Sequence, residues 1–74
     1  MYETVIHIRG NNIVGRYEDA VTAAIAYNKA VDTLAANGIH KKYTKNYIQT
    51  LSSDEYKKMY ENVVISKKIS EYTT

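Results

Sequence analysis

Hydrophobic and polar residues alternate imperfectly at the start of the chain, and this pattern predicts a β-hairpin. Residues 2–8 are rich in β-branched side chains, which suit a pleated and half-buried surface. Residues 10–12 (Gly-Asn-Asn) tolerate the positive φ angles of a tight turn, and residues 13–17 resume the strand. Gly15, inside the second strand, indicates a β-bulge or the close approach of another group.

The spacing of apolar residues then changes to that of a helix. Glu18 and Asp19 place negative charge where a helix N-terminus favours it, and Asp19 is suited to cap the helix. Asn37 and Gly38 end the helix, with Gly38 suited to the left-handed C-cap position. One face consists mainly of small residues and lets the backbone lie close to a sheet: Ala20, Ala23, Ala24, Tyr27, Ala30, Val31 and Leu34.

The second half of the chain predicts a third strand over residues 43–50, where β-forming side chains recur. Residues 63–70 (VVISKKIS) favour a short final strand, and residues 71–74 are expected to fray. The expected fold class is α+β. It is a single domain over residues 1–74, with a small antiparallel sheet of about three strands packed on one alanine-rich helix.

A short second helix is predicted between these two strands. Ser52 followed by Glu55 is the capping-box pattern that starts a helix. Apolar and aromatic residues continue at helical spacing: Tyr56, Met59, Tyr60 and Val63. The sequence leaves open whether the chain after Leu51 packs on its own domain or on a neighbouring copy.

Length and composition restrict the class of protein. A chain of 74 residues buries only about 60% of the surface that its unfolded form exposes, so its core is marginal. The absence of cysteine excludes disulfides and thiolate metal sites. No apolar run approaches the roughly 20 residues of a membrane span, and the start lacks the features of a secretion signal. These features favour a soluble cytoplasmic protein.

The net charge of +2 is not typical of a strong nucleic-acid binder, but the second half of the chain is mildly basic. Residues 40–45 (HKKYTK) interleave lysines, which contact phosphates, with a tyrosine, which can stack on a base. A solvated loop that balances the helix C-terminus is the plainer interpretation. Together with the hairpin arginines, the candidate nucleic-acid-binding residues are Arg9, Arg16, Lys41, Lys42 and Lys45.

Every aromatic residue is a tyrosine, eight in all, which favours a core rim or an interface where the hydroxyl stays wet. Tyrosine and methionine are enriched at interfaces, and an isologous homodimer would bury them economically. The candidate dimer-interface residues are Tyr43, Tyr47, Tyr56, Met59 and Tyr60.

No catalytic, cofactor or metal site is expected. His7 and His40 have no carboxylate at metal-ligand spacing, and the serines have neither a nucleophile-elbow motif nor an identifiable base. Each glycine is explained by a turn, a bulge or a cap. We therefore do not expect an enzyme.

One stretch resembles a known DNA-binding family. Gly15-x-Tyr17, followed by Ala23-Ala24-x-Ala26-Tyr27-Asn28-Lys29-Ala30, is similar to the Apetala/ethylene-response-factor domain. The resemblance covers roughly a fifth to a quarter of the chain. It implies a three-stranded sheet on the alanine-rich face, with strand arginines and tryptophans that read DNA. This chain has no tryptophan, and its hairpin offers only Arg9 and Arg16.

The whole chain also resembles a small, functionally uncharacterised family of Bacillus prophage proteins, the YopT-like proteins. That resemblance implies a phage-type homodimer of one main helix and three strands. Two hypotheses follow. The first is a nucleic-acid-binding module whose five candidate cations share one face. The second is a homodimeric interaction module that uses a tyrosine-rich surface, with a host protein as a further candidate partner.

Overall fold

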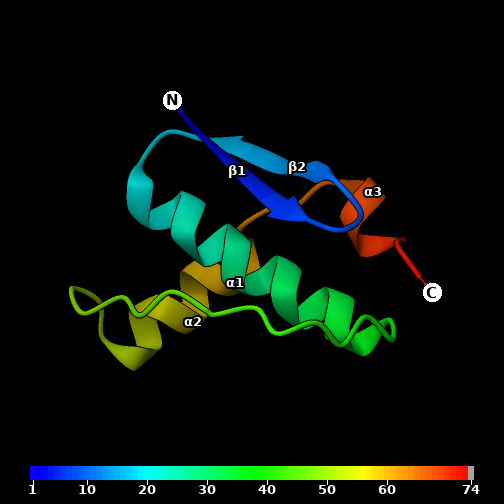
Figure 1. Cartoon of the computed structure of the whole chain (residues 1–74). Helices are drawn as coiled ribbons and strands as arrows, with labels where there is room; N and C mark the ends of the chain where they lie inside the picture. Colours follow the sequence, from blue (N-terminus) through cyan, green and yellow to red (C-terminus); the bar gives the residue numbers. More distant parts are fainter. Residues whose placement is uncertain (74) are drawn as a thin grey trace.

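The computed structural model describes residues 1–73 and contains two strands and three helices. These are β1 (Tyr2–His7), β2 (Asn11–Tyr17), α1 (Ala20–Ala36), α2 (Ser53–Asn62) and α3 (Lys67–Ser70). The antiparallel β1–β2 hairpin covers one side of α1, and α2 packs on another side (Figure 1). The fold class is α+β, as predicted, but the described residues form two strands rather than about three.

The hairpin turns earlier than the Gly-Asn-Asn pattern predicts. Arg9 and Gly10 have the positive φ angles, 55° and 126°, while Asn11 and Asn12 belong to β2. The buried side chain of Asn12 donates hydrogen bonds of 3.1 Å to the carbonyls of Ile8 and Gly10. A strand residue therefore holds the turn from inside, and Arg9 lies at the hairpin tip.

Gly15 has both features that its position predicts. Thr4 pairs with Gly15 and Val5 with Ile13, so Val14 is the extra residue of a β-bulge. The ring of Tyr17 also lies directly over Gly15, since a Cβ atom there would come within 2.7 Å of the Tyr17 Cζ. Without a side chain at this position, Tyr17 can lie flat along the strand.

Local signals start and end α1 as predicted. The Asp19 carboxylate accepts a hydrogen bond of 2.7 Å from the backbone N–H of Thr22. At the other end Gly38 has a φ of 93°, and the N–H of Ile39 donates to the Leu34 carbonyl at 2.8 Å. Ile39 and Leu34 are both buried, which completes a Schellman motif with its hydrophobic contact.

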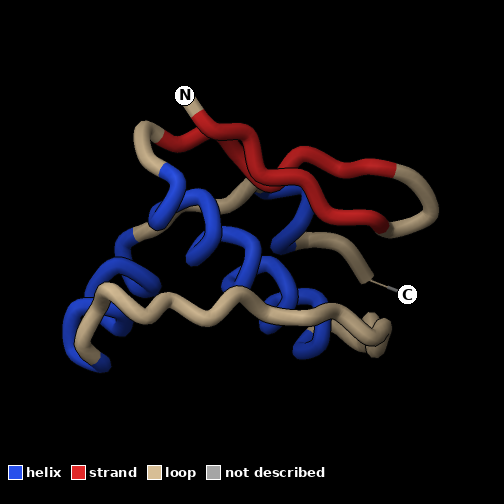
Figure 2. The backbone as a smooth tube through the Cα atoms, turned by 60° about the vertical axis from the view of Figure 1, so that its left-hand side comes forward, coloured by secondary structure: helices blue, strands red, loops and turns tan. Residues whose placement is uncertain are grey.

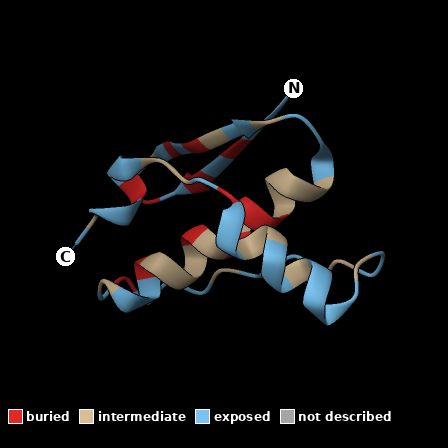
Figure 3. Ribbon diagram, turned by 180° about the vertical axis from the view of Figure 1, so that it is seen from behind, coloured by how far each residue is buried: buried red, intermediate tan, exposed pale blue. Residues whose placement is uncertain are grey.

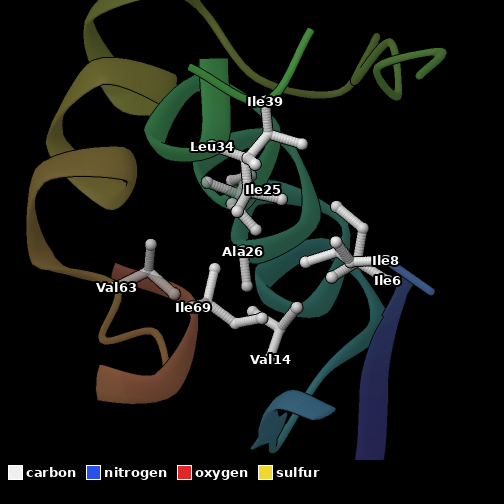
Figure 4. Close-up of a cluster of buried hydrophobic side chains, with 10 residues drawn as sticks. Ile6, Ile8, Val14, Ile25, Ala26, Leu34, Ile39, Val63 and Ile69 are labelled. Carbon is white, nitrogen blue, oxygen red and sulfur yellow. The ribbon is translucent and has the colours of Figure 1, made fainter. Parts of the chain in front are cut away.

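Helix α1 is buried more widely than the predicted face. Ile25, Ala26 and Asn28 are buried, whereas Ala20 is exposed. The reason is that the hairpin, α2 and α3 all contact α1. The small residues let neighbours approach from several directions, and the core forms between these elements (Figures 3 and 4). Its members are Ile6, Ile8, Val14, Ile25, Ala26, Ala30, Leu34, Ile39, Val63 and Ile69.

The predicted strand over residues 43–50 is wrong. This segment runs along α1 without strand pairing (Figure 2). The buried side chain of Asn28 donates to the Asn46 carbonyl at 2.9 Å and accepts from the Asn46 N–H at 2.7 Å. A side-chain amide of the helix therefore satisfies the backbone groups that a neighbouring strand would otherwise satisfy.

The predicted strand over residues 63–70 is also wrong. Two bonds link this segment to β2: the Ser66 N–H donates to the Val14 carbonyl, and the Tyr17 hydroxyl donates to the Val64 carbonyl, both at 2.7 Å. Ser66 then caps the short helix α3, which turns Ile69 into the core. Tyr72 packs against the core, so the expected fraying does not begin before it. Thr74 lies outside the described residues.

The capping box predicted for α2 is confirmed. The Ser52 hydroxyl accepts from the Glu55 N–H at 3.2 Å, and the Glu55 carboxylate accepts from the Ser52 N–H at 3.3 Å. Tyr56, Met59 and Tyr60 are half-buried and pack against the core of the same chain. The chain after Leu51 therefore docks on its own domain.

Candidate nucleic-acid interface

Three segments that are distant in sequence meet at one end of the molecule. They are the hairpin turn (residues 8–10), the segment that follows α1 (residues 37–43), and α3 with residues 71–73 (Figure 1). Tyr43 donates a hydrogen bond of 2.6 Å from its hydroxyl to the His7 carbonyl. Asn37 donates one of 2.9 Å from its side chain to the Ser70 carbonyl. These bonds hold the three segments in place relative to one another.

Exposed cations concentrate at this end. We call it the basic end and define it by Arg9, Lys41, Lys42, Lys67 and Lys68, all exposed. None of the five forms an ion pair within residues 1–73. Glu71 is the one acidic residue of these segments. The acidic residues Glu3, Glu18 and Asp19 lie at or next to the start of α1, about 25 Å away along a helix of 17 residues.

A pocket of about 300 Å³ opens within the basic end. The buried side chains of Ile8 and Ile39 line it, together with the half-buried Tyr72. The exposed residues Arg9, His40 and Lys41 also line it, together with Gly38 and Thr73. The pocket thus combines an apolar surface and an aromatic ring with cations. A larger hollow of about 540 Å³ along β2 has Lys68 as its one charged lining residue.

The structure brings together three of the five nucleic-acid candidates predicted from the sequence. Arg9, Lys41 and Lys42 belong to the basic end. Arg16 lies near the opposite end of the hairpin, about 20 Å from the tip, and pairs with Glu3 at 3.1 Å. Lys45 pairs with Asp32 of α1. Arg16 and Lys45 therefore do not belong to the basic end, and each has a carboxylate partner.

Sequence reasoning missed Lys67, Lys68 and Tyr72 as parts of this end. It assigned the two lysines to a strand and the tyrosine to a frayed tail. Ser66 was the available signal, because serine is a preferred N-cap and its side chain accepts from the Lys68 N–H at 3.2 Å.

Most of the candidate interface tyrosines make contacts within the chain. Tyr43 packs edge-on against Tyr27, with ring centroids 6.5 Å apart, and burial, reinforced by Tyr27 and Tyr72, raises its pKa. Tyr56 accepts a hydrogen bond of 3.0 Å from Asn28. Of the five candidates, Tyr47 is the most exposed, at 85%.

Tyr60 belongs to a charged cluster that joins three segments. Its hydroxyl donates to the Asp32 carboxylate at 2.7 Å, and Lys45 pairs with the same carboxylate. Burial would raise the pKa of Asp32, but the donors Lys45 and Tyr60 outweigh it and hold this pKa below its usual value. Burial and the neighbouring Asp32 raise the pKa of Tyr60. The cluster fastens α2 and residues 43–50 to α1.

The described residues hold no group of three His, Asp or Glu side chains placed to bind a metal ion. His7 is exposed at the end of β1, and His40 lies in the basic end. Within residues 1–73, no helix combines the length and apolar character required to cross a bilayer.

Comparison of the chain with protein-family models, with curated proteins and with solved structures gives no match. The resemblances to the Apetala/ethylene-response-factor domain and to the YopT-like prophage proteins therefore stay predictions. Function is inferred from the geometry of the chain's own residues.

Proposed function

We propose that this chain is a small, non-enzymatic nucleic-acid-binding module that contacts phosphates through the basic end. The observation that supports this most directly is that three separate segments, which carry five exposed and unpaired cations, meet at one end of the described chain. Lysines and arginines that neutralise phosphates release condensed counterions, and this release favours binding without reading sequence. Because the net charge is only +2, we expect modest affinity. Because counterion release drives the binding, we expect the affinity to fall as salt rises.

A homodimer is a second element of the proposal, supported by a different surface from the predicted tyrosines. Val5 and Ile13 are cross-strand partners on the outer face of the hairpin, and they are 36% and 49% exposed. If the outer hairpin faces of two copies packed together, Val5 and Ile13 would be removed from water. Sedimentation velocity over a range of protein concentrations tests whether this dimer forms. A small phage-type protein that binds nucleic acid as a dimer is compatible with the prophage resemblance.

Two pairs of adjacent lysines allow a matched test of the phosphate contacts. K41Q/K42Q removes two charges from the basic end, and K57Q/K58Q removes two exposed charges from α2. Binding of a labelled mixed-sequence DNA duplex is measured by fluorescence anisotropy over a series of salt concentrations. We expect K41Q/K42Q to reduce the slope of log K against log salt by about 1.8, since each phosphate contact contributes about 0.9.

K57Q/K58Q should keep the slope of the unaltered protein. Equal losses in the two variants would indicate that net charge alone governs binding, and would overturn the assignment to the basic end. No binding of duplex or single-stranded DNA at low salt would overturn the proposed function itself.

A further inference from the structure

The pocket of the basic end has a lining that phosphate contacts alone do not explain. Ile8 and Ile39 give it an apolar surface, and Tyr72 adds an aromatic ring. The hydroxyls of Tyr17, Tyr43 and Tyr60 each donate to an acceptor in the chain. The Tyr72 hydroxyl has no such bond within residues 1–73. Its ring is thus held by packing against the core, and it lines the pocket.

We infer that this pocket takes one unstacked nucleobase, and that the preferred ligand of the protein is single-stranded nucleic acid. The inference rests on the proposed function, because the same basic end must hold the backbone. Tyr72 stacks on the base, Ile8 and Ile39 cover its edge, and Arg9 and Lys41 at the rim contact the flanking phosphates.

The pocket is large enough to hold a single planar ring. Its volume of about 300 Å³ lies at the lower limit of small-ligand sites, which span about 300 to 1,000 Å³. Stacking of a base on an aromatic side chain is tolerant of sequence, because every base presents a π-face. The exposed Arg9 and His40 carry N–H groups that can donate to the polar edge of a base.

The position of Tyr72 favours a single strand over a duplex. The ring is half-buried between the hairpin turn and the residues after α1, so a base must leave its stack to reach it. In a duplex this step requires unpairing and unstacking, whereas a single strand presents bases that are already free.

The first test needs no variant of the protein. Affinity is measured for an oligothymidylate, for an abasic strand with the same number of phosphates, and for a duplex of the same length. Stacking of one base predicts that the oligothymidylate binds about tenfold more tightly than the abasic strand. Equal affinity for the two strands, or tighter binding of the duplex, would overturn the inference.

The second test uses Tyr72→Leu, which keeps an apolar side chain against the core but removes the ring. We expect this variant to bind the oligothymidylate about as weakly as the abasic strand, while its affinity for the abasic strand is unchanged. Tyr47→Leu, at an exposed tyrosine outside the pocket, is the matched control and should keep the tenfold preference.

The outcomes separate this inference from the proposed function. If both strands bind equally and both depend on Lys41 and Lys42, phosphate binding stands and the base pocket is refuted. If neither strand nor the duplex binds, both fail. If Tyr72→Leu unfolds, as followed by circular dichroism, the comparison of oligothymidylate with the abasic strand still decides.

Discussion

At the scale of single residues, tyrosine hydroxyls link elements that share little backbone pairing. Tyr17 donates to the Val64 carbonyl at 2.7 Å, Tyr43 to the His7 carbonyl at 2.6 Å, and Tyr60 to Asp32 at 2.7 Å. Each ring is half-buried. A tyrosine can bury its ring in a small core while its hydroxyl satisfies a polar group at the rim, which phenylalanine cannot do. This accounts for tyrosine at these three positions.

The contact of Tyr17 with Gly15 gives a prediction at this scale. In Gly15→Ala the new methyl group would displace the Tyr17 ring and break its bond to Val64. We expect a loss of about 1–2 kcal/mol in the free energy of unfolding, measured by urea denaturation.

A double-mutant cycle is the control for this substitution. In a Tyr17→Leu background the alanine no longer meets the ring, so Gly15→Ala should cost much less there. The same cost in both backgrounds would show that strand conformation, and not the ring, disfavours alanine at position 15.

At the scale of elements, local caps delimit the helices and charged side chains fasten them together. Asp19 caps α1, Ser52 caps α2 and Ser66 caps α3, each through a side-chain oxygen that accepts from a backbone N–H. Between elements, Asp32 of α1 receives Tyr60 from α2 and Lys45 from the extended segment. The carboxylate of Asp32 thus attaches both α2 and the extended segment to α1.

The lowered pKa of Asp32 predicts sensitivity to acid. Because its pKa is lower in the folded state, its contribution to stability is complete above the unfolded value of about 3.9 and is lost as the pH falls through the folded value. Asp32→Asn should therefore be less stable at neutral pH and should lose less additional stability on acidification, measured as urea midpoints at neutral pH and about pH 2.

Two comparisons control the acid prediction. Glu61→Gln, an exposed carboxylate without an ion pair in the described chain, should keep the acid response of the unaltered protein. Hydrogen bonds from Thr22 also lower the pKa of Asp19, so some acid sensitivity persists in Asp32→Asn. An unchanged response in Asp32→Asn would contradict the assignment to Asp32.

At the scale of the whole molecule, α1 is the central element and the other segments pack around it. The hairpin packs on α1 and also bonds to it, since the Thr4 hydroxyl donates to the Ala23 carbonyl at 2.9 Å. The long connection between α1 and α2 runs beside α1 (Figure 2). Side chains of α1, above all that of Asn28, hold it there. The position of this connection therefore depends on a few side-chain contacts and not on a ladder of backbone hydrogen bonds.

Hydrogen exchange should reveal this arrangement. We expect the amides of α1 to be the most protected, while those of residues 40–48 exchange through local opening, with Asn46 as a protected exception. Asn28→Ala should remove the protection of Asn46 and lower the free energy of unfolding by about 1–2 kcal/mol, because the part-buried backbone groups of Asn46 lose their partner.

Asn62→Ala, at an exposed asparagine of α2, is the matched control and should leave both measurements unchanged. If Asn46 exchanges as fast as its neighbours in the unaltered protein, the bonds to Asn28 do not hold the segment in solution.

The candidate site was only partly predictable from the sequence. Arg9, Lys41 and Lys42 were recognised from their charge and position, and the structure places them at one end. Arg16 and Lys45 satisfied the same criteria, but each has a carboxylate partner that is distant in sequence. Tyr72 joined the pocket because Ile69 is buried and brings the tail with it.

The sequence by itself determined the two strands of the hairpin but not the position of its turn, α1 with both of its caps, and the start of α2. Those features depend on groups a few residues apart, such as Asp19 with Thr22, Ser52 with Glu55, and Gly38 at positive φ. Only the tertiary structure decided the path of residues 43–50 and 63–70. An extended chain leaves its backbone groups free until a partner satisfies them, and here the partners include the side chain of Asn28 and the carbonyl of Val14.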